Sequence, residues 1–474
     1  MQQDNPYRED SERLRELLYR FENLKNGRPQ SFIEEESFEK IIEHYQEQDE
    51  LKTALLAADM ACEQYPYSAL LQVKKADVML ALRRYREALD ILDQASLLDA
   101  RDINNYILKT EAYLALDQQE KAVELLEEAI GSFEGEDRTE LLFELADVYD
   151  DYENFDKVFD CLRLVLEAEP TNEEALYKIC FWTDFTGRNE EGIRLHQQII
   201  DDYPYNELAW FNLAAAYQGL KLYEKAIDAY KFAITIEEKF DYAYRNMGDA
   251  YIRLRKYREA IEALEKVNEI AKPEDVIFEA IGYCYEKLKN PAQARFYYRK
   301  ASHLRQDDSK LIYKIACTYF NEGQWQACFR QLETALKMHR NQPDYHLLAG
   351  ECKLYQGQYR EAIQYFTQVV RLRPRSTKGW EALTRCLFRA GFLDEALEQL
   401  DAALQLTGNK PLFIYYKAAV LFADGRSKEA LIQLENALQA APKLLSRMVA
   451  LHPPLLQHQQ LVDLLARYKR RKSI

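Results

Sequence analysis

The side chains that could perform catalysis or bind a metal ion are scattered through this sequence. The seven histidines form no cluster with the spacing of metal ligands, and the eight cysteines include no C-x-x-C pair. The chain also lacks the G-x-x-x-x-G-K-S/T, G-x-G-x-x-G, H-E-x-x-H and G-x-S-x-G motifs of nucleotide-binding proteins, zinc proteases and serine hydrolases. We therefore expect no catalytic residue, no metal and no cofactor, and we predict that the protein is not an enzyme.

Another set of residues is suited to recognition. Phe211 and Asn212 are followed 34 residues later by Arg245 and Asn246. Asparagine amides can hydrogen-bond a peptide backbone, and Phe and Arg are favoured at protein interfaces. The equal spacing requires repeated elements that place these side chains on one surface.

The 34-residue spacing runs through most of the chain. Small residues, mostly alanine, recur from Ala54 to Ala430 at steps of 34, with one step of 36 that we assign to two extra residues in the loop EGEDR (134–138). The units this defines are 35–68, 69–102, 103–136, 139–172, 173–206, 207–240, 241–274, 275–308, 309–342, 343–376, 377–410 and 411–444.

Each unit has the pattern of two helices. At 100° per residue, positions 4, 7, 8 and 11 of a unit cluster on one face of a first helix, and positions 20, 24 and 27 on one face of a second. Small residues at positions 8, 20 and 27 would let the helices approach closely. Glycines at position 15, such as Gly323 and Gly391, would end the first helix. Because no hairpin can bury its face alone, the units should stack on their neighbours.

This pattern resembles the tetratricopeptide repeat family. Its characteristic positions are matched in 207–240 by Trp210, Leu213, Ala214, Tyr217, Ala226, Tyr230 and Ala233. The resemblance implies an all-α, right-handed superhelical solenoid of about twelve 34-residue helix-turn-helix repeats. We divide the chain into an N-terminal capping helix (1–34), units 1–3 (35–136), units 4–12 (139–444) and a C-terminal capping helix with a basic tail (445–474). The predicted caps are the helical stretches 8–25, with Leu14, Leu17, Leu18 and Phe21 on one face, and 453–471.

The resemblance also implies where a ligand would bind. In this family the face of the first helices opposite the core lines a concave groove that holds peptides. The residues predicted to contact a peptide or protein partner there are Tyr177, Phe181, Phe211, Asn212, Tyr242, Arg245, Asn246, Asp249, Tyr283 and Tyr313, and Phe185 and Phe320 lie on the same face. Alternatively, aromatic residues at these positions pack against the next repeat. The carboxylate clamp of chaperone-tail binders is not matched, and only Asn212 and Asn246 occupy the slot of an asparagine ladder.

Charge is distributed unevenly along the chain. The net charge is −16, but residues 1–206 carry 48 acidic and 22 basic side chains, whereas residues 207–474 carry 31 and 41. Asp147, Asp150, Asp151 and Asp184 lie on the predicted groove face and could steer a basic partner. A solvated acidic surface is the other interpretation. The asymmetry also allows a self-assembling homo-oligomer, in which an acidic half meets a basic half. The net charge of −16, with acidic side chains on the predicted groove face, disfavours nucleic acid, since phosphates bind to basic side chains.

We expect a cytoplasmic protein. The N-terminus has neither a basic start nor an apolar core, and no apolar run reaches about 18 residues, so we predict neither export nor membrane insertion. Cysteines within apolar helical stretches suit buried, reduced thiols. The predicted function is a protein-binding scaffold or adaptor that grips an extended peptide or a partner helix.

Overall fold

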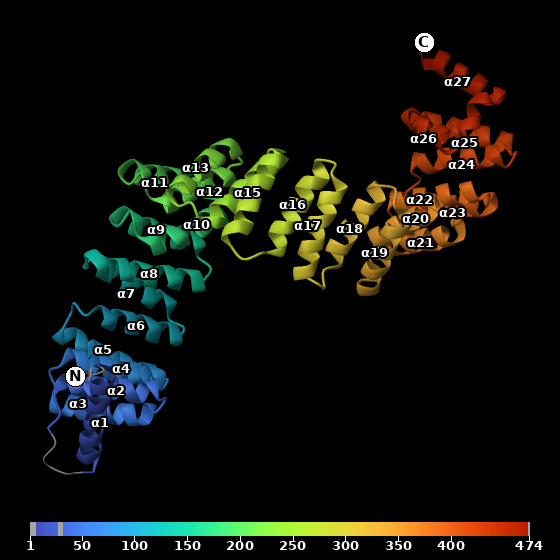
Figure 1. Cartoon of the computed structure of the whole chain (residues 1–474). Coiled ribbons are helices and arrows are strands. Elements are labelled where there is room, and N and C mark those ends of the chain that lie inside the picture. Colours follow the sequence, from blue (N-terminus) through green and yellow to red (C-terminus); the bar gives the residue numbers. More distant parts are fainter. Residues whose placement is uncertain (1–5, 27–31, 473–474) are drawn as a thin grey trace, which may run out of the picture. The chain divides into compact units, whose positions relative to one another are not determined.

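The computed structural model describes residues 6–26 and 32–472, and within those residues it contains helices and turns but no strand (Figure 1). The all-α prediction is therefore confirmed for the described part of the chain. Contacts divide the protein into an N-terminal unit that ends at Glu238 and a C-terminal unit that begins at Lys239. We describe each unit by itself.

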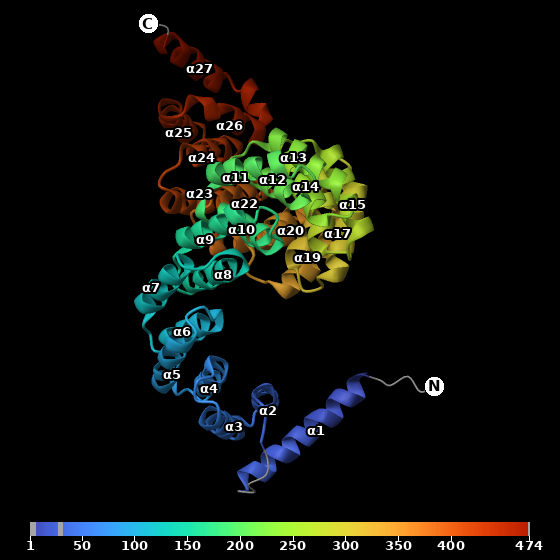
Figure 2. The ribbon, with the colours of Figure 1, turned by 90° about the vertical axis from the view of Figure 1, so that its left-hand side faces the viewer.

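The N-terminal unit consists of one leading helix and six helical hairpins. Its helices are α1 (Pro6–Lys25), α2 (Glu35–Glu47), α3 (Leu51–Gln64), α4 (Ala69–Ala81), α5 (Tyr85–Leu98), α6 (Ile103–Ala115), α7 (Gln119–Ile130), α8 (Gly135–Asp151), α9 (Phe155–Ala168), α10 (Glu173–Thr186), α11 (Asn189–Asp202), α12 (Glu207–Gly219) and α13 (Tyr223–Ile236). The hairpins from α2 to α9 follow one another in chain order (Figure 2).

The C-terminal unit continues with six more hairpins and a closing segment. Its helices are α14 (Asp241–Arg253), α15 (Tyr257–Ile270), α16 (Asp275–Lys287), α17 (Pro291–Leu304), α18 (Ser309–Asn321), α19 (Trp325–Met338), α20 (Pro343–Tyr355), α21 (Tyr359–Leu372), α22 (Thr377–Ala390), α23 (Leu393–Thr407), α24 (Pro411–Ala423), α25 (Ser427–Ala440), η1 (Pro442–Leu444), α26 (Leu445–Leu451), η2 (Pro453–Gln457) and α27 (Gln459–Lys472). Within each unit, every second helix packs on the first helix of the next hairpin.

The predicted repeat register matches the helix starts in eleven of the twelve repeats, where the first helix begins at the first residue of the repeat. The fourth repeat differs. Its first helix, α8, begins at Gly135, so most of the segment EGEDR is helical and not a loop as predicted. The two extra residues thus lengthen a helix. Its first turn contains the acidic side chains Glu136 and Asp137, and negative charges at the start of a helix interact favourably with the helix dipole.

The turn inside each hairpin depends on one left-handed residue at position 15. This residue has a positive φ in all twelve repeats, from +56° to +81°. It is glycine in five repeats (Gly187, Gly323, Gly357, Gly391 and Gly425) and a larger residue in seven (Asp49, Arg83, Asp117, Glu153, Lys221, Arg255 and Lys289). Only glycine adopts this conformation without steric cost. The prediction that position 15 ends the first helix is confirmed.

We expect Gly391→Ala to lower the free energy of unfolding by about 1 kcal/mol, because alanine is strained in the left-handed region. The added methyl group would meet no atom within 4 Å, so the effect reports backbone conformation alone. Gly131→Ala is the control. Gly131 also lies at the end of a helix, but its own φ is −71°, a value that alanine adopts without strain. Thermal unfolding should show a lower midpoint for Gly391→Ala and little change for Gly131→Ala. Equal midpoints for the two variants would contradict this account.

Small residues at position 8 allow the two helices of a hairpin to touch. A methyl group built on Gly282 would lie 2.7 Å from the Tyr298 ring, and one on Gly350 would lie 2.6 Å from the Phe366 ring. Both rings belong to position 24 of the same repeat and are fully buried. The predicted close approach of the helices is confirmed at these positions.

Side chains at position 4 hold the loop between hairpins. The indole Nε1 of Trp210 donates a hydrogen bond to the carbonyl oxygen of Pro204 at 2.9 Å, and Trp380 donates in the same way to Pro374 at 2.8 Å. In each case the acceptor lies six residues earlier, at position 32 of the preceding repeat. The tryptophan therefore contributes buried apolar area, and its N–H also satisfies a carbonyl group of the loop.

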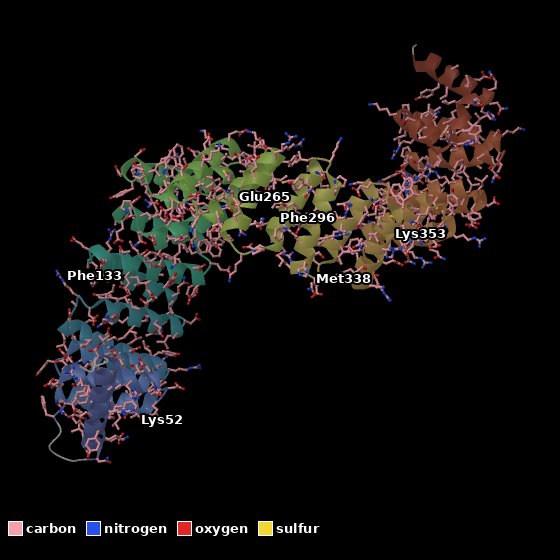
Figure 3. All side chains as sticks on the ribbon, in the orientation of Figure 1. Lys52, Phe133, Glu265, Phe296, Met338 and Lys353 are labelled. Atoms are coloured by element: carbon pink, nitrogen blue, oxygen red, sulfur yellow. The ribbon has the colours of Figure 1, made fainter. Side chains whose placement is uncertain are left out.

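Two lysines replace apolar residues at core positions, and both are paired. Lys109 is buried at position 7, where its ammonium group lies 2.7 Å from Asp93 and 2.8 Å from the Ser96 hydroxyl. Lys353, labelled in Figure 3, is buried at position 11 and pairs with Glu361 at 2.7 Å, with its Nζ atom 4.0 Å from the centre of the Phe329 ring. Pairing keeps these charges from the large cost of burial in isolation.

Helical segments outside the repeats pack on the first and the last hairpin, and the C-terminal segment differs from the single helix that was predicted. Helix α1 packs on α2 and buries Phe21 completely, 5.7 Å from the ring of Tyr45. At the other end, the predicted single helix 453–471 is instead the 3-10 turn η2 followed by α27. The hydroxyl of Tyr468 donates a hydrogen bond to the carbonyl oxygen of Leu438 at 2.7 Å, which ties α27 to α25. Pro454 disfavours the α-helical conformation at the preceding residue, Pro453, which agrees with the absence of a regular helix at this point.

Candidate functional site

Helix α10 carries three exposed aromatic side chains in one row. Tyr177, Phe181 and Phe185 are spaced four residues apart and are 62%, 59% and 56% exposed. We call these three residues the α10 stripe. The side chain of Asn172 caps the start of the helix by accepting a hydrogen bond from the backbone N–H of Ala175, and Gly187 ends it in the left-handed conformation. The capped helix thus fixes the row on one face.

Two further aromatic residues, Phe155 and Trp182, contact rings of the α10 stripe. Trp182 stacks on Phe155 with ring centres 5.3 Å apart, and Phe155 meets Phe185 edge-on at 4.9 Å. Phe181 and Phe185 are themselves stacked at 5.6 Å. Sequence reasoning missed Phe155 and Trp182, although their close spacing to the predicted aromatics was the available signal. The rings of Phe155, Phe181, Trp182 and Phe185 thus form one aromatic cluster on α9 and α10.

The fifth repeat, which contains α10, is packed in an unusual way. Helix α10 lies mainly against α9 and α12 and makes little contact with α11, its own hairpin partner (Figure 1). At the hairpin interface, a methyl group on Gly192 would lie 2.7 Å from the side chain of Thr183. His196 occupies position 24, where the other repeats carry leucine, alanine or an aromatic residue. It is fully buried, and desolvation lowers its pKa to about 3. A neutral histidine therefore fills this core.

Asn212 does not have the surface position predicted for it. The side chain is 3% exposed, and its amide donates a hydrogen bond to the carbonyl oxygen of Leu176 at 2.7 Å. That bond links α12 to α10. The amide is used for cohesion between repeats and is not available to a peptide, so the predicted rung of an asparagine ladder is wrong at this residue. Phe211, which precedes it, is half-buried with its ring 5.7 Å from the ring of Tyr230.

We expect Asn212→Ala to lower the free energy of unfolding by about 1 to 2 kcal/mol, because it removes a buried hydrogen bond. Asn246→Ala is the matched control, since Asn246 occupies the same repeat position but is half-exposed, and such a change usually alters stability by less than about 0.5 kcal/mol. Thermal or denaturant unfolding measures both. A stability loss in the Asn246 variant that equals that of the Asn212 variant would contradict the assigned role.

Exposed carboxylates lie on α10 itself and on α8, which the side chain of Lys178 connects to α10. Asp147, Asp150 and Asp151 on α8 and Asp184 on α10 are all exposed, and their steering role stays a prediction. The ammonium group of Lys178 connects α10 to α8. It lies 3.7 Å from a carboxylate oxygen of Asp147 on α8 and 2.9 Å from one of Glu174 on α10. Among the residues that the structure describes, Asp150, Asp151 and Asp184 have no ion-pair partner. This surface combines aromatic rings with unneutralised negative charge.

The acidic surface continues over the preceding first helices. Asp77, Glu111 and Asp147 occupy position 9 of three successive repeats, and Phe181 occupies it in the next. Desolvation and the neighbouring carboxylate of Asp77 raise the pKa of Glu111, and desolvation with the carboxylate of Asp147 raises that of Glu144. Mutual repulsion of this kind would be relieved by a cation.

In the C-terminal unit, the predicted residues are mostly engaged within the chain. Tyr242 is 58% exposed, and the guanidinium of Arg245 lies 5.8 Å from its ring centre. Arg245 donates two hydrogen bonds to Glu274, at 2.8 and 2.9 Å, and the carboxylate of Asp249 lies 3.4 Å from Arg253. Tyr242 is therefore the most exposed predicted residue of this unit, with Arg245 over its ring.

The other two predicted tyrosines contact their own neighbours. Tyr283 is half-buried, with the ammonium of Lys287 4.9 Å from its ring centre. Tyr313 is half-buried and stacks on Tyr345 of the next repeat, with ring centres 4.9 Å apart. Tyr313 thus follows the alternative interpretation, in which a groove aromatic packs between repeats.

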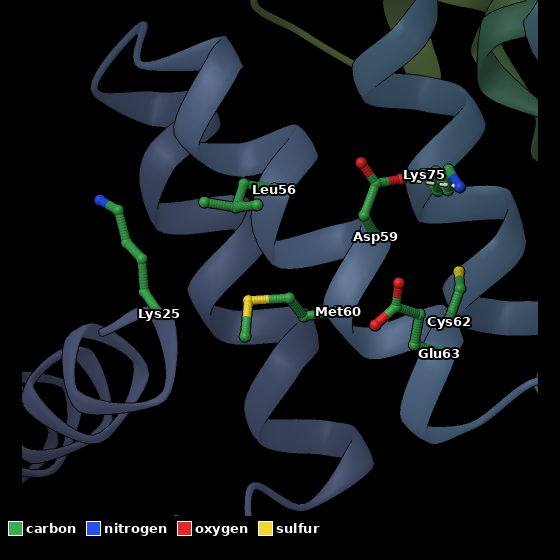
Figure 4. Close-up of a pocket in the computed structure, with 7 residues that line it drawn as sticks. All are labelled: Lys25, Leu56, Asp59, Met60, Cys62, Glu63 and Lys75. Atoms are coloured by element: carbon green, nitrogen blue, oxygen red, sulfur yellow. Dashed lines mark ion pairs between the residues drawn. The ribbon is translucent and has the colours of Figure 1, made fainter. Parts of the chain in front are cut away.

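A cavity of about 610 Å³ lies between the end of α1 and helices α3 and α4 (Figure 4). Asp59 and Lys75 form an ion pair there at 2.7 Å, and the thiol of Cys62 donates to the carbonyl oxygen of Leu71. Burial raises the pKa of that thiol, which disfavours a reactive thiolate. Because these groups are engaged within the chain, the α10 stripe is the stronger candidate.

Within the described residues, no group of three or more potential ligands is placed to hold a metal ion. All eight cysteines are free thiols, and five of them are buried. No helix of the described part combines the length and apolarity needed to cross a membrane. The arrangement offers rings, carboxylates and amides, which are groups for binding.

Comparisons with known proteins agree with the repeat pattern. Models of the tetratricopeptide repeat match residues 208–240, 242–273, 353–411 and 387–444. A model described as anaphase-promoting complex, cyclosome, subunit 3 matches residues 289–369. A curated protein of Drosophila melanogaster, described as a BBSome complex member BBS4 homolog, is 26% identical over 161 residues, which is 31% of this chain and 33% of that protein. The match thus spans about a third of the length of this relative.

Three solved structures are also similar. YrrB, described as a TPR protein with an unusual peptide-binding site, is 20% identical and covers 40% of this chain and 96% of its own, with a TM-score of 0.36. The Cut9–Hcn1 hetero-tetramer of APC/C is 13% identical over 82% of this chain and 97% of its own, with a TM-score of 0.34. The C-terminal part of a TPR repeat-containing protein from Cytophaga hutchinsonii is 17% identical over 51% and 99%, with a TM-score of 0.45.

Proposed function

Because the chain belongs to the tetratricopeptide repeat family, whose members are protein-interaction scaffolds, we propose that it acts as a scaffold or adaptor that holds a partner segment on its first helices. The N-terminal unit is proposed to provide the main contact. The observation that carries this proposal is the α10 stripe, since exposed aromatic rings gain free energy when a partner covers them. The burial of each ring contributes about 25 cal/mol to the free energy of binding for every Å² of apolar area removed from water.

The proposed binding residues are those that the structure leaves accessible. Tyr177 and Phe181 serve as anchors, and Asp147, Asp150, Asp151 and Asp184 steer a basic partner toward them. In the C-terminal unit, Tyr242 is proposed as a separate contact point. The partner is a protein or a peptide, and binding requires no catalytic residue or cofactor.

The comparisons support a role in a multi-protein assembly. One matching model describes a subunit of the anaphase-promoting complex, and the curated relative is described as a member of the BBSome complex. Free thiols at all eight cysteines support a reducing compartment, and we propose the cytoplasm.

Capture of partners from a lysate of the native organism tests the proposal. The full chain is immobilised as wild type, as the double variant Tyr177→Ala/Phe181→Ala and as Phe296→Ala. Phe296, labelled in Figure 3, is a 50% exposed aromatic on α17 and serves as the control. We expect a specific protein to be retained by wild type and by the control and to fall at least about tenfold with the double variant, since anchors of this kind contribute more than about 1 kcal/mol each.

A second candidate function is self-assembly, favoured by the charges of the two units. Residues up to Glu238 include 53 acidic and 25 basic side chains, whereas residues from Lys239 include 26 and 38. Opposite charges on two copies would attract each other at low salt and be screened at high salt. Light scattering of the purified chain at about 20 mM and 500 mM salt should then show an oligomer that dissociates. A monomer at both salt concentrations would rule out this alternative and leave the adaptor role.

A further inference from the structure

The protein repeatedly combines an aromatic ring, a carboxylate and an arginine in one contact. The guanidinium of Arg188 lies 4.2 Å from the centre of the Phe159 ring and 2.9 Å from the carboxylate of Asp160. Arg295 lies 4.3 Å from the centre of the Tyr319 ring and 2.8 Å from Glu322. Planar guanidinium groups stack on rings while their edges donate to carboxylates, so the three groups satisfy one another.

The α10 stripe has two of these three components. Phe181 and Phe185 present rings that are more than half exposed, and Asp184 lies on the same helix, three residues after Phe181, with an exposed carboxylate. Within the described part of the chain, no lysine or arginine lies over either ring, and none pairs with Asp184. The missing component is a cation.

A cation is already held in this way beside the α10 stripe. The ammonium of Lys178 lies 5.0 Å from the centre of the Phe143 ring on α8, and it pairs with Asp147 and Glu174. The surface between α8 and α10 therefore accommodates a positive charge over a ring. The carboxylates of Asp150 and Asp151, at the end of α8, leave the region negative after Lys178 is counted.

We propose that the partner segment bound at the α10 stripe carries an arginine that stacks on Phe181 or Phe185 and pairs with Asp184. This inference rests on the proposed function and adds the chemical class of the ligand. Charge complementarity selects a basic segment. Arginine is selected over lysine because its guanidinium is planar and more weakly hydrated, so it covers a ring at a smaller desolvation cost while it donates to a carboxylate. The occupant is a segment of another protein.

Peptide binding tests the ligand class directly. Two fluorescein-labelled peptides of twelve residues differ only in having three arginines or three lysines among serine and leucine, and they are titrated with the full chain at about 150 mM salt while anisotropy is measured. We expect the arginine peptide to bind at least about fivefold more tightly to wild type, the size of a modest cation–π difference. Phe181→Ala/Phe185→Ala should remove this preference, so that the two peptides bind within about twofold of each other.

Charge and folding need their own controls. Asp184→Asn should weaken the arginine peptide at least about threefold, whereas Asp201→Asn, which removes an exposed carboxylate from α11, should change it by less than about 1.5-fold. Circular dichroism verifies that each variant remains helical. Because the rings of the α10 stripe are more than half exposed, its alanine variants should remain folded, and Phe296→Ala should keep the preference for arginine.

Several results would overturn the inference. Equal affinities for the two peptides, no measurable binding of either, or a preference for arginine that survives in Phe181→Ala/Phe185→Ala would each do so. If the arginine peptide bound only after salt had dissociated an oligomer, a second copy of the chain would be the occupant. The failures are distinguishable. A partner lost from the Tyr177→Ala/Phe181→Ala lysate capture, without a preference for arginine, would leave the proposed function intact and reject only the ligand class.

Discussion

Close contact between the two helices of a repeat, found in all repeats but the fifth, is the constraint on which the other features of this protein depend. Where position 24 of the second helix carries a ring, as at Tyr298, position 8 must be small, because a methyl group on Gly282 would lie 2.7 Å from that ring. Once that face is used within the repeat, the second helix is free to pack on the next hairpin. Cohesion thus comes from neighbours in sequence, as in other repeat proteins, and the opposite face of each first helix does not have to hold the fold together.

The fifth repeat shows what happens when this arrangement is altered. Helix α10 packs mainly on α9 and α12 and little on its hairpin partner α11. The amide of Asn212 donates a hydrogen bond across the contact between α12 and α10. Phe155 and Trp182 then support a row of rings that stays exposed. The unusual packing and the exposed aromatic surface occur in the same repeat, which connects the internal structure of the repeat to its proposed role in binding.

Electrostatics distinguishes this surface from an ordinary apolar patch. Position 9 carries a carboxylate on α4, α6 and α8, and in the next repeat it carries Phe181. Partial burial, and after it the neighbouring carboxylates, raises the pKa of Glu111 and of Glu144. Since charges are screened over about 8 Å at physiological salt, this local field persists whatever the net charge of distant repeats. A basic ligand would gain both from the field and from the rings.

The sequence by itself determined the repeat register, the helical hairpins and the turn at position 15, because these depend on residue types at fixed spacing and on local backbone sterics. It also located Tyr177 and Phe181 on an exposed face, since helical periodicity alone separates that face from the core. Tertiary structure decided which groove residues remain available. Asn212 and Asn246 have identical repeat positions, yet only Asn212 meets a carbonyl of a neighbouring helix, and Tyr313 meets Tyr345 where Tyr242 stays exposed. Such outcomes depend on how adjacent repeats pack, which is a matter of distances between helices and cannot be obtained from the spacing within one helix.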